Sequence, residues 1–446
     1  MQLPTSIFVI QRGVLVASSD FSVVRGMRDM LPDVAKKKQA IEDRIRKEFE
    51  AYGFEPIETP IVEDFALLSA KGSAGESIKD DIYYFKDKAD RELGLRFDLT
   101  VPLARVIVNN PQLVKPFKRY QIGKVYRYDK PGASRYREFT QADVDIVGSS
   151  SIMADYECVA LAYKIMKDLS FNFSIRVSNK KLLADICLAS NVPEDKVKDC
   201  MRSIDKMDKV GVAGVKKELS EKGIPSEVMD VIGRNDLKEI AKLVKDKTGL
   251  NELQELLDYC EKSGLTEFVK FDASLARGLE YYTGNVFEVT SKNEKGEVGP
   301  SVGGGGRYDN LVETYGGPKT PCVGISFGVD RLVDLREKEL CEQLTQLMIV
   351  PIGLEAGKEC LKIGRELRAV GLNVENDLMQ RSLQKNLEYA NKKRIPFVAI
   401  IGENEIKEGV MAIKNLTSGK QEKVKLADTK KIKELIKTQE ETKEKK

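Results

Sequence analysis

The chain has 446 residues, of which 41% are hydrophobic and 32% charged, and its formal net charge is +3. This balance is typical of a globular protein of two or three domains. No apolar run is long enough to cross a bilayer, so we expect no membrane contact. The chain contains no histidine and no tryptophan. The lack of histidine excludes Ser-His-Asp and Cys-His catalysis, histidine general bases and histidine-ligated metal sites.

Seven cysteines are scattered singly along the chain, without a CxxC pair. Their odd number and wide spacing predict reduced thiols and a cytoplasmic location. A zinc site would need thiolates from distant segments, so we expect no zinc and assign no metal ligands. The nearly neutral net charge neither favours nor excludes a nucleic-acid partner, which only local patches can indicate.

The first half of the chain predicts a mixture of helices and strands. Residues 1–20 form a short N-terminal extension that lacks the basic start of a signal peptide. A helix is expected over 33–52, where apolar residues recur at helical spacing, and a strand interrupted by prolines follows it. Residues 81–148 alternate short β-prone runs with turns and predict an antiparallel sheet. A further helix at 152–168 precedes a strand at 173–178.

The second half changes character twice. Residues 180–268 are dense in Lys, Glu and Asp, with apolar residues at helical intervals, and predict a helical insert. A glycine-rich turn is expected at 303–306. From about residue 345 strands and helices alternate, which predicts a separate small α/β domain over 345–429. The last stretch, 430–446, is a charged tail whose composition fits either a helix or a disordered segment.

The densest local signal lies at 115–139, where eight basic residues meet only two acidic ones and aromatic residues are interleaved. Basic groups attract phosphate, and aromatic or guanidinium planes can stack on bases. A solvated hairpin whose charges face water is the alternative, and the spacing favours neither. The glycine run before Arg307 can let backbone approach a ligand closely, but it matches no Walker loop and no dinucleotide fingerprint.

Several ionisable residues lie in apolar surroundings. Asp98, Asp143 and Asp145 occur in mostly apolar strands, where a buried carboxylate is costly unless it is paired. Arg277 lies among apolar residues in LARGLEYY and likewise needs an anion. Taken alone, these residues are explained best by internal Asp–Arg pairs that serve the architecture.

These fragments occur together and in one order. Over roughly residues 21–430 the chain resembles a class II aminoacyl-tRNA synthetase, and within that class the histidyl-tRNA synthetase family. The helix from Asp33 with FEPIETP resembles motif 1, with Pro60 at the motif proline. VYRYDKPGASRYREF resembles motif 2, and GISFGVDR resembles motif 3. LARGLEYYTG (275–284) and GGGRYDNL (304–311) are similar to the histidyl-specific signatures, which are far more specific than the class motifs.

The resemblance implies an α+β fold, in which a class II catalytic domain over 21–335 combines an antiparallel sheet with flanking helices. The helical insertion domain at 180–268 would interrupt it, and a C-terminal α/β anticodon-binding domain at 345–429 would follow. The implied reaction is the ATP-dependent ligation of L-histidine to tRNA(His) through a histidyl-adenylate, releasing pyrophosphate and AMP, with Mg²⁺ accompanying ATP. The implied partners are L-histidine, ATP, tRNA(His) and a second copy of the chain in a homodimer.

The resemblance also assigns roles to single residues. Arg127 and Arg277 are implied as catalytic, because they would hold the ATP α-phosphate and the amino-acid carboxylate. The implied ATP site consists of Arg127, Asp129, Arg135, Phe139 and Arg331. The implied histidine site consists of Asp98, Leu99, Thr100, Arg127, Gln141, Asp145, Arg277, Tyr281, Tyr282 and Tyr308.

This assignment comes with one departure from the family pattern and with two alternative functions. Asp98 and Asp145 stand where bacterial-type members usually carry glutamates, so the chain looks like the archaeal or eukaryotic branch. A non-catalytic, synthetase-like regulatory subunit of histidine biosynthesis is the alternative function. Such relatives are expected to lose parts of the site and the C-terminal domain, whereas Arg127 and Arg277 are present here. A threonyl enzyme would need Cys and His zinc ligands that this chain cannot supply.

Overall fold

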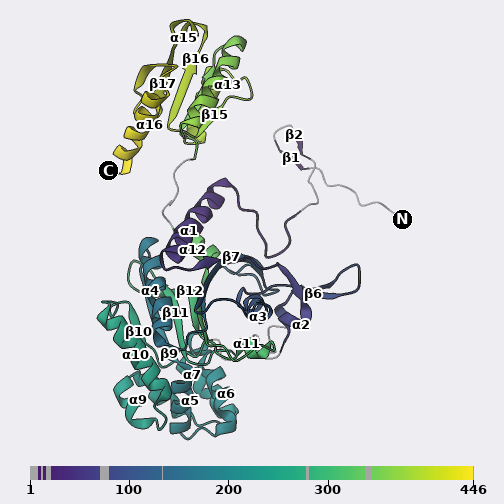
Figure 1. Cartoon of the computed structure of the whole chain (residues 1–446), viewed down its shortest axis with the longest axis vertical. Helices are drawn as coiled ribbons and strands as arrows, with labels where there is room; N and C mark the ends of the chain where they lie inside the picture. Colours follow the sequence, from purple (N-terminus) through teal and green to yellow (C-terminus); the bar gives the residue numbers. More distant parts are fainter. Residues whose placement is uncertain are drawn as a thin grey trace. The chain divides into compact units, whose positions relative to one another are not determined.

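The computed structural model describes residues 9–11, 14–16, 22–70, 80–132, 134–277, 281–336 and 344–444. The chain divides into two compact units, residues 1–340 and 341–446 (Figure 1). Of the predicted N-terminal extension, the described part is an antiparallel pair of short strands, β1 (Val9–Gln11) and β2 (Val14–Val16). None of the described helices is both long and apolar enough to span a bilayer.

An eight-stranded sheet forms the frame of the first unit, in the order β10-β9-β11-β12-β13-β8-β7-β3. Its strands are β3 (Glu55–Pro56), β7 (Phe117–Tyr126), β8 (Glu138–Val147), β9 (Phe173–Asn179), β10 (Val269–Phe271), β11 (Asn285–Lys292), β12 (Val298–Arg307) and β13 (Cys322–Gly328). The inner pairs are antiparallel, as predicted. The two edge pairs, β10 with β9 and β3 with β7, are parallel.

Helices α1 (Pro32–Ala51), α4 (Ile152–Asp168) and α12 (Val329–Leu335) pack on this sheet. The structure confirms the helices predicted over 33–52 and 152–168. Val144 and Val323, from β8 and β13, join the buried side chains of these helices in one core. Because successive side chains of a strand point to opposite faces, the residues that alternate with them face the other side of the sheet. The candidate site lies on that other side.

The segment from 180 to 262 is helical, as the sequence predicted. It contains α5 (Lys180–Ala189), a 3₁₀ turn (Glu194–Lys196), α6 (Val197–Ile204), α7 (Met207–Glu221), α8 (Val228–Arg234), α9 (Leu237–Leu243) and α10 (Thr248–Lys262). Figure 1 shows these helices gathered near β9 and β10. Their buried side chains, such as Leu253 and Leu256 of α10, belong to the same core as the sheet. The insert is therefore packed onto the large sheet.

A small sheet in the order β4-β6-β5 and three short helices complete the first unit. They are β4 (Val62–Asp64), α2 (Phe65–Leu68), β5 (Tyr84–Lys86), β6 (Glu92–Leu95), α3 (Thr100–Asn109) and α11 (Leu311–Thr314). Helix α3 interrupts the run over 81–148 that was predicted as β structure alone. Asp98 Oδ1 accepts a hydrogen bond from Val101 N at 3.0 Å. This bond satisfies an amide that the first helical turn leaves free.

The turn predicted at 303–306 is wrong, because all four glycines lie within β12. A Cβ on Gly305 would stand 2.0 Å from the carbonyl oxygen of Gly324 on the neighbouring strand. Only glycine tolerates strands that approach so closely at this position. The glycine run therefore serves the sheet rather than a reversal of the chain.

The second unit contains a five-stranded sheet in the order β15-β14-β16-β17-β18. Its elements are β14 (Leu347–Pro351), α13 (Leu354–Ala369), β15 (Val374–Asn376), α14 (Leu383–Lys392), β16 (Phe397–Ile401), α15 (Glu403–Glu408), β17 (Val410–Asn415), β18 (Gln421–Lys425) and α16 (Thr429–Glu444). Ile432 and Ile436 of α16 are fully buried in the core of this unit. Of the two interpretations of the charged stretch from residue 430, a helix or a disordered tail, the structure shows the helix up to Glu444.

Candidate functional site

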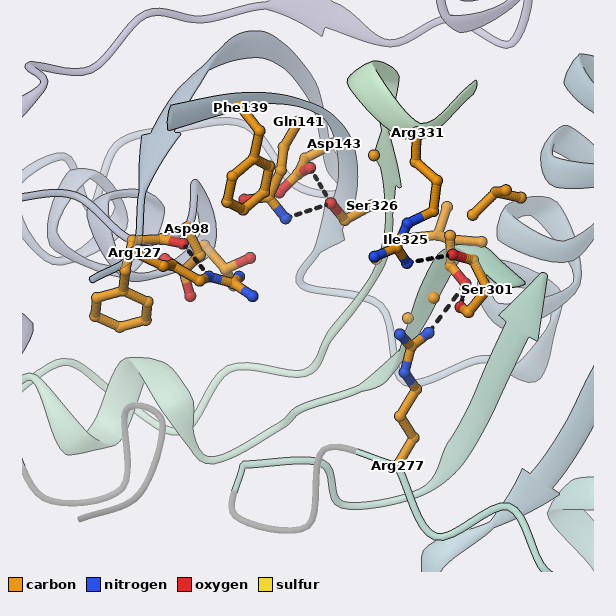
Figure 2. A pocket seen from close by; sticks show the side chains of 18 of the residues that line it. Asp98, Arg127, Phe139, Gln141, Asp143, Arg277, Ser301, Ile325, Ser326 and Arg331 are labelled. Carbon is orange, nitrogen blue, oxygen red and sulfur yellow. Dashed lines mark hydrogen bonds between the residues drawn. The ribbon is translucent and has the colours of Figure 1, made fainter. Parts of the chain in front are cut away.

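A cavity of about 500 Å³ opens on the face of the large sheet opposite α1 and α4 (Figure 2). Residues of the neighbouring strands β8 and β13 form the bottom of the cavity. In their register Asp143 lies opposite Ser326 and Asp145 lies opposite Gly324. Gln141 occupies the next position of the same face of β8. Alternation along β8 thus brings three polar side chains to one face of the sheet.

The cavity collects the predicted site residues with one exception. They are Asp98, Thr100, Arg127, Asp129, Arg135, Phe139, Gln141, Asp145, Arg277, Tyr281, Tyr282, Tyr308 and Arg331. The exception is Leu99, whose side chain is fully buried away from the cavity. Its carbonyl oxygen instead accepts a hydrogen bond from Arg119 Nη2 at 3.1 Å. Residues 278–280 of the LARGLEYYTG stretch lie outside the described residues.

One end of the cavity is acidic, with Asp98, Asp143 and Asp145 facing the same space. Burial raises the pKa of Asp98 and of Asp145 above their ordinary values. Burial raises the pKa of Asp143 to about 7, although the nearby Arg119 guanidinium and a hydrogen bond from Ser326 oppose the shift. A group of buried carboxylates in such a place favours a cationic ligand group.

Three tyrosines form the wall beside these acids. Tyr308 donates a hydrogen bond from its hydroxyl to Asp145. The Tyr281 hydroxyl donates to the Tyr282 hydroxyl at 3.2 Å, and the Tyr281 ring meets the Tyr308 ring edge-on at 5.8 Å between centroids. Burial raises the pKa of all three, so they stay protonated. Aromatic faces with inward hydroxyls suit a small polar ring.

Four arginines also line the cavity. Arg127 follows β7 and donates from Nε to the carbonyl oxygen of Phe97 at 3.1 Å, with its guanidinium 5.3 Å from the Phe139 ring centroid. Arg277 donates from Nη1 to the carbonyl oxygen of Gly303 at 3.0 Å, and Arg331 donates from Nη1 to that of Ser301 at 2.5 Å. In Figure 2 these last two side chains approach one region from opposite sides.

These arginines repel one another. Burial lowers the pKa of Arg331, and the charges of Arg277, Arg135 and Arg127 lower it further. Arg135 belongs to the loop between β7 and β8, where it pairs with Asp129. Four guanidinium groups around one cavity form a site for an anion with several oxygens, such as a polyphosphate or a carboxylate.

The basic segment 115–139 was interpreted either as a phosphate-binding segment or as a solvated hairpin. The segment is a hairpin of β7 and β8, and some of its charges do face outward: Lys118 pairs with Glu157 at 2.6 Å and Lys124 with Glu138 at 2.5 Å. Arg127 and Arg135 instead face the cavity. The hairpin therefore carries both outward-facing charges and charges that line the cavity.

Two glycines make room for the charged side chains. A Cβ on Gly304 would stand 1.8 Å from Arg277 Nη1, and a Cβ on Gly324 would stand 2.1 Å from Asp145 Oδ1. The sequence indicated that the glycine run allows close approach. The group that approaches Gly304 is a side chain of the same protein.

The resemblance included neither Asp143 nor Ser326 nor Arg119 among the site residues. Asp143 could have been included, because it alternates with Gln141 and Asp145 along one strand and must share their face. Ser326 and Arg119 become visible only from strand register, which the sequence does not fix. Within the described residues, no group of three or more Cys, Asp or Glu side chains is arranged to hold a metal ion.

Comparisons with known proteins agree with this arrangement. The family model of histidyl-tRNA synthetase matches residues 26–332, and that of an anticodon binding domain matches residues 346–435. A histidine–tRNA ligase 1 from Bacillus cereus is 39% identical over 418 residues, which are 91% of this chain and 97% of that protein. A histidine–tRNA ligase from Methanococcus maripaludis is 37% identical over 422 residues, which are 92% of this chain and 99% of that protein.

Among solved structures, the crystal structure of histidyl-tRNA synthetase from Nostoc sp. PCC 7120 superposes with a TM-score of 0.81 at 32% identity. The superposition covers 93% of this chain and 99% of that one. The relatives come from bacteria and from an archaeon at similar identity, so the branch expected from Asp98 and Asp145 stays a prediction.

Proposed function

Because the chain belongs to the histidyl-tRNA synthetase family, we propose that it activates L-histidine with ATP and transfers it to tRNA(His). It is a class II aminoacyl-tRNA synthetase and a histidine–tRNA ligase. The observation that carries the proposal is one cavity lined both by buried aspartates with tyrosines beside them and by four arginines. The aspartates and tyrosines suit the ammonium and ring of histidine, and the arginines suit the phosphates of ATP, which enters with Mg²⁺.

In the first step a histidine carboxylate oxygen attacks the α-phosphorus of ATP in line, and the bond to pyrophosphate breaks. The nucleophile is already an anion, so the step needs no protein base. Positioning and cations placed where charge develops on phosphorus supply the acceleration. Arg127 and Arg277 fit this role, since both guanidinium groups line the cavity.

The remaining contacts follow from which residues line each end. We assign the adenine to the space between Phe139 and Arg331, with Asp129 near its amino group and Arg135 on the terminal phosphate. We assign the histidine ammonium group to Asp98, Thr100 and Gln141. Asp145 faces the imidazole, and Tyr281, Tyr282 and Tyr308 enclose it.

In the second step the 3′-terminal hydroxyl of the tRNA attacks the adenylate carbonyl, and AMP leaves. The second unit, which matches an anticodon binding domain, would hold the tRNA at its other end.

We further infer a homodimer built on the motif 1 helix, where Leu31 and Val34 expose apolar surface. The described cysteines, all buried free thiols, support a cytoplasmic setting: Cys158, Cys187, Cys200, Cys260, Cys322 and Cys360.

The proposed function is tested by pyrophosphate–ATP exchange with each of the twenty amino acids, without tRNA. Exchange with histidine alone is the expected result. A well-folded protein that exchanges with no amino acid would contradict the proposal and favour the regulatory subunit. Nothing in the cavity favours that alternative, since Arg127, Arg277 and Arg331 all line it.

Replacing Gly304 by alanine is expected to reduce histidine-dependent exchange by about 10–100-fold while the protein stays folded. The added Cβ would stand 1.8 Å from Arg277 Nη1, so the guanidinium must leave its position. The initial rate of exchange and the circular dichroism spectrum check this prediction. Gly357→Ala is the control, because a Cβ there meets nothing within 4 Å. Equal rates in the two variants would contradict the prediction.

Histidine binding is expected to depend on the ionisation of Asp143, whose pKa is about 7 in the free protein. Below that pH the carboxyl is mostly protonated, and it must release its proton to attract the ligand ammonium group. The affinity should therefore fall as pH drops below 7, approaching about tenfold per unit for this group.

Calorimetric titration with histidine at pH 6, 7 and 8 measures this dependence in the wild type and in Asp143→Asn. The ligand imidazole titrates in the same range, so the difference between the two proteins isolates the contribution of Asp143. The variant should bind more weakly at pH 8 and show the shallower pH dependence. Parallel curves for the two proteins would remove Asp143 from binding.

A further inference from the structure

Arg119 is a fully buried arginine directly behind the acidic end of the cavity. It lies on β7 opposite Asp145 on β8, so both side chains leave the same face of the sheet. Its exposed fraction is 0%, and it does not line the cavity itself. Its Nη2 donates to the carbonyl oxygen of Leu99 at 3.1 Å and pairs with Asp145. Nε and Nη1 have no hydrogen-bond partner among the described residues.

Two contacts hold Asp145, and a glycine makes room for it. Arg119 contacts its Oδ2, and the Tyr308 hydroxyl donates to its Oδ1. Gly324 replaces a side chain that would collide with Oδ1. These contacts orient the carboxylate of Asp145, which lines the cavity.

The charge of Arg119 determines what Asp145 can recognise. A carboxylate that is buried without a counter-ion takes up a proton and becomes a hydrogen-bond donor as well as an acceptor. A buried guanidinium beside the carboxyl opposes this rise in pKa and favours the anion, which only accepts hydrogen bonds. An acceptor-only group at this place selects a ligand ring that presents an N–H, and it rejects apolar rings of similar size.

We propose that Arg119 is a positioning residue for amino-acid selection, which fixes the charge and the orientation of Asp145 without touching the substrate. The proposal rests on the proposed function, because it takes histidine to be the ligand beside Asp145. It predicts that loss of Arg119 weakens recognition of histidine while leaving the ATP end of the cavity intact.

The test is pyrophosphate–ATP exchange by the full-length chain, with separate titrations of histidine and of ATP. Arg119→Met keeps the length of the side chain and removes its charge. We expect its KM for histidine to rise by about 10–100-fold, the range of one hydrogen bond to a charged group. The KM for ATP should stay within about twofold. Arg119→Lys restores the charge and should recover part of the affinity for histidine.

Arg307→Met is the matched control, because Arg307 is also buried and paired with an aspartate but does not line the cavity. If the control raises the KM for histidine as much as Arg119→Met does, the effect is structural and the proposal is overturned. An unchanged KM in Arg119→Met also overturns it.

If Arg119→Met does not fold, as judged by circular dichroism, the Arg119→Lys and Asp145→Asn variants carry the test. The proposal then requires a raised KM for histidine in Asp145→Asn and an intermediate value in Arg119→Lys. Wild-type KM values in both would overturn it. A wild-type protein that exchanges with no amino acid would instead overturn the proposed function, and this inference with it.

Discussion

Arg277→Ala is expected to slow histidine-dependent pyrophosphate–ATP exchange by on the order of 10²–10³-fold, as the loss of one oxyanion donor does elsewhere. The Arg277 guanidinium donates to the carbonyl oxygen of Gly303 at 3.0 Å and lies 3.3 Å from Glu288 Oε1. These contacts hold the positive charge of Arg277 at the cavity before the substrate binds. Alanine removes a cation that stabilises the transition state more than the bound substrates, so kcat should fall more than affinity.

The rate is measured at saturating histidine and ATP, and histidine binding is measured separately by calorimetry. Arg202→Ala is the control, since Arg202 is an exposed arginine of the insert that pairs with Asp199 at 3.4 Å. Free guanidinium added to Arg277→Ala should restore part of the rate. An unchanged rate in Arg277→Ala would remove this residue from the mechanism.

Much of the site could be predicted because its residues belong to short, ordered motifs. Strand alternation then explains why Gln141 and Asp145 line one cavity, since both leave β8 on one face. The cavity does not include Leu99, because a neighbour of two cavity residues need not point into the cavity. Motif membership identifies a segment, but only the direction of each side chain identifies a contact.

The features that the sequence left hidden depend on strand pairs that are distant in the chain. Glycine normally disfavours strand interiors, so a run of glycines reads as a turn. Here Gly304 and Gly305 are required because Arg277 and the backbone of β13 approach β12 closely. Arg119 could not be assigned, because its importance arises from its register with Asp145. Helix α3 was missed because its residues are β-prone. Its first turn is stabilised by the hydrogen bond from Val101 N to Asp98 Oδ1.

Arg307 was singled out in the sequence as the residue after the glycine run, yet the structure gives it an architectural role. It is 3% exposed and pairs with Asp155, which is fully buried. Its Nη1 donates to the carbonyl oxygen of Ser149 at 2.8 Å and its Nη2 to that of Ser151 at 2.9 Å. One guanidinium thereby ties β12 to the segment that leads into α4.

Arg307→Met is therefore expected to lower the free energy of unfolding of the first unit by about 3–5 kcal/mol, the cost of breaking a buried ion pair from one side. The variant leaves a buried carboxylate without its counter-ion and two carbonyl oxygens without a donor. Urea unfolding followed by circular dichroism measures the loss. Arg202→Met, at an exposed arginine, should change stability by less than about 0.5 kcal/mol.

The loss should also depend on pH. Burial already raises the pKa of Asp155 to about 6 with Arg307 in place, and Arg307 opposes that shift. Without the guanidinium the folded-state pKa rises further above the unfolded value, so the folded variant holds a proton that the unfolded chain releases. Its stability relative to the wild type must therefore fall as pH rises from 6 to 8. Arg307→Met combined with Asp155→Leu removes both charges and should recover most of the loss. A deficit that does not change with pH, or that persists in the double variant, would show that the ion pair is not its cause.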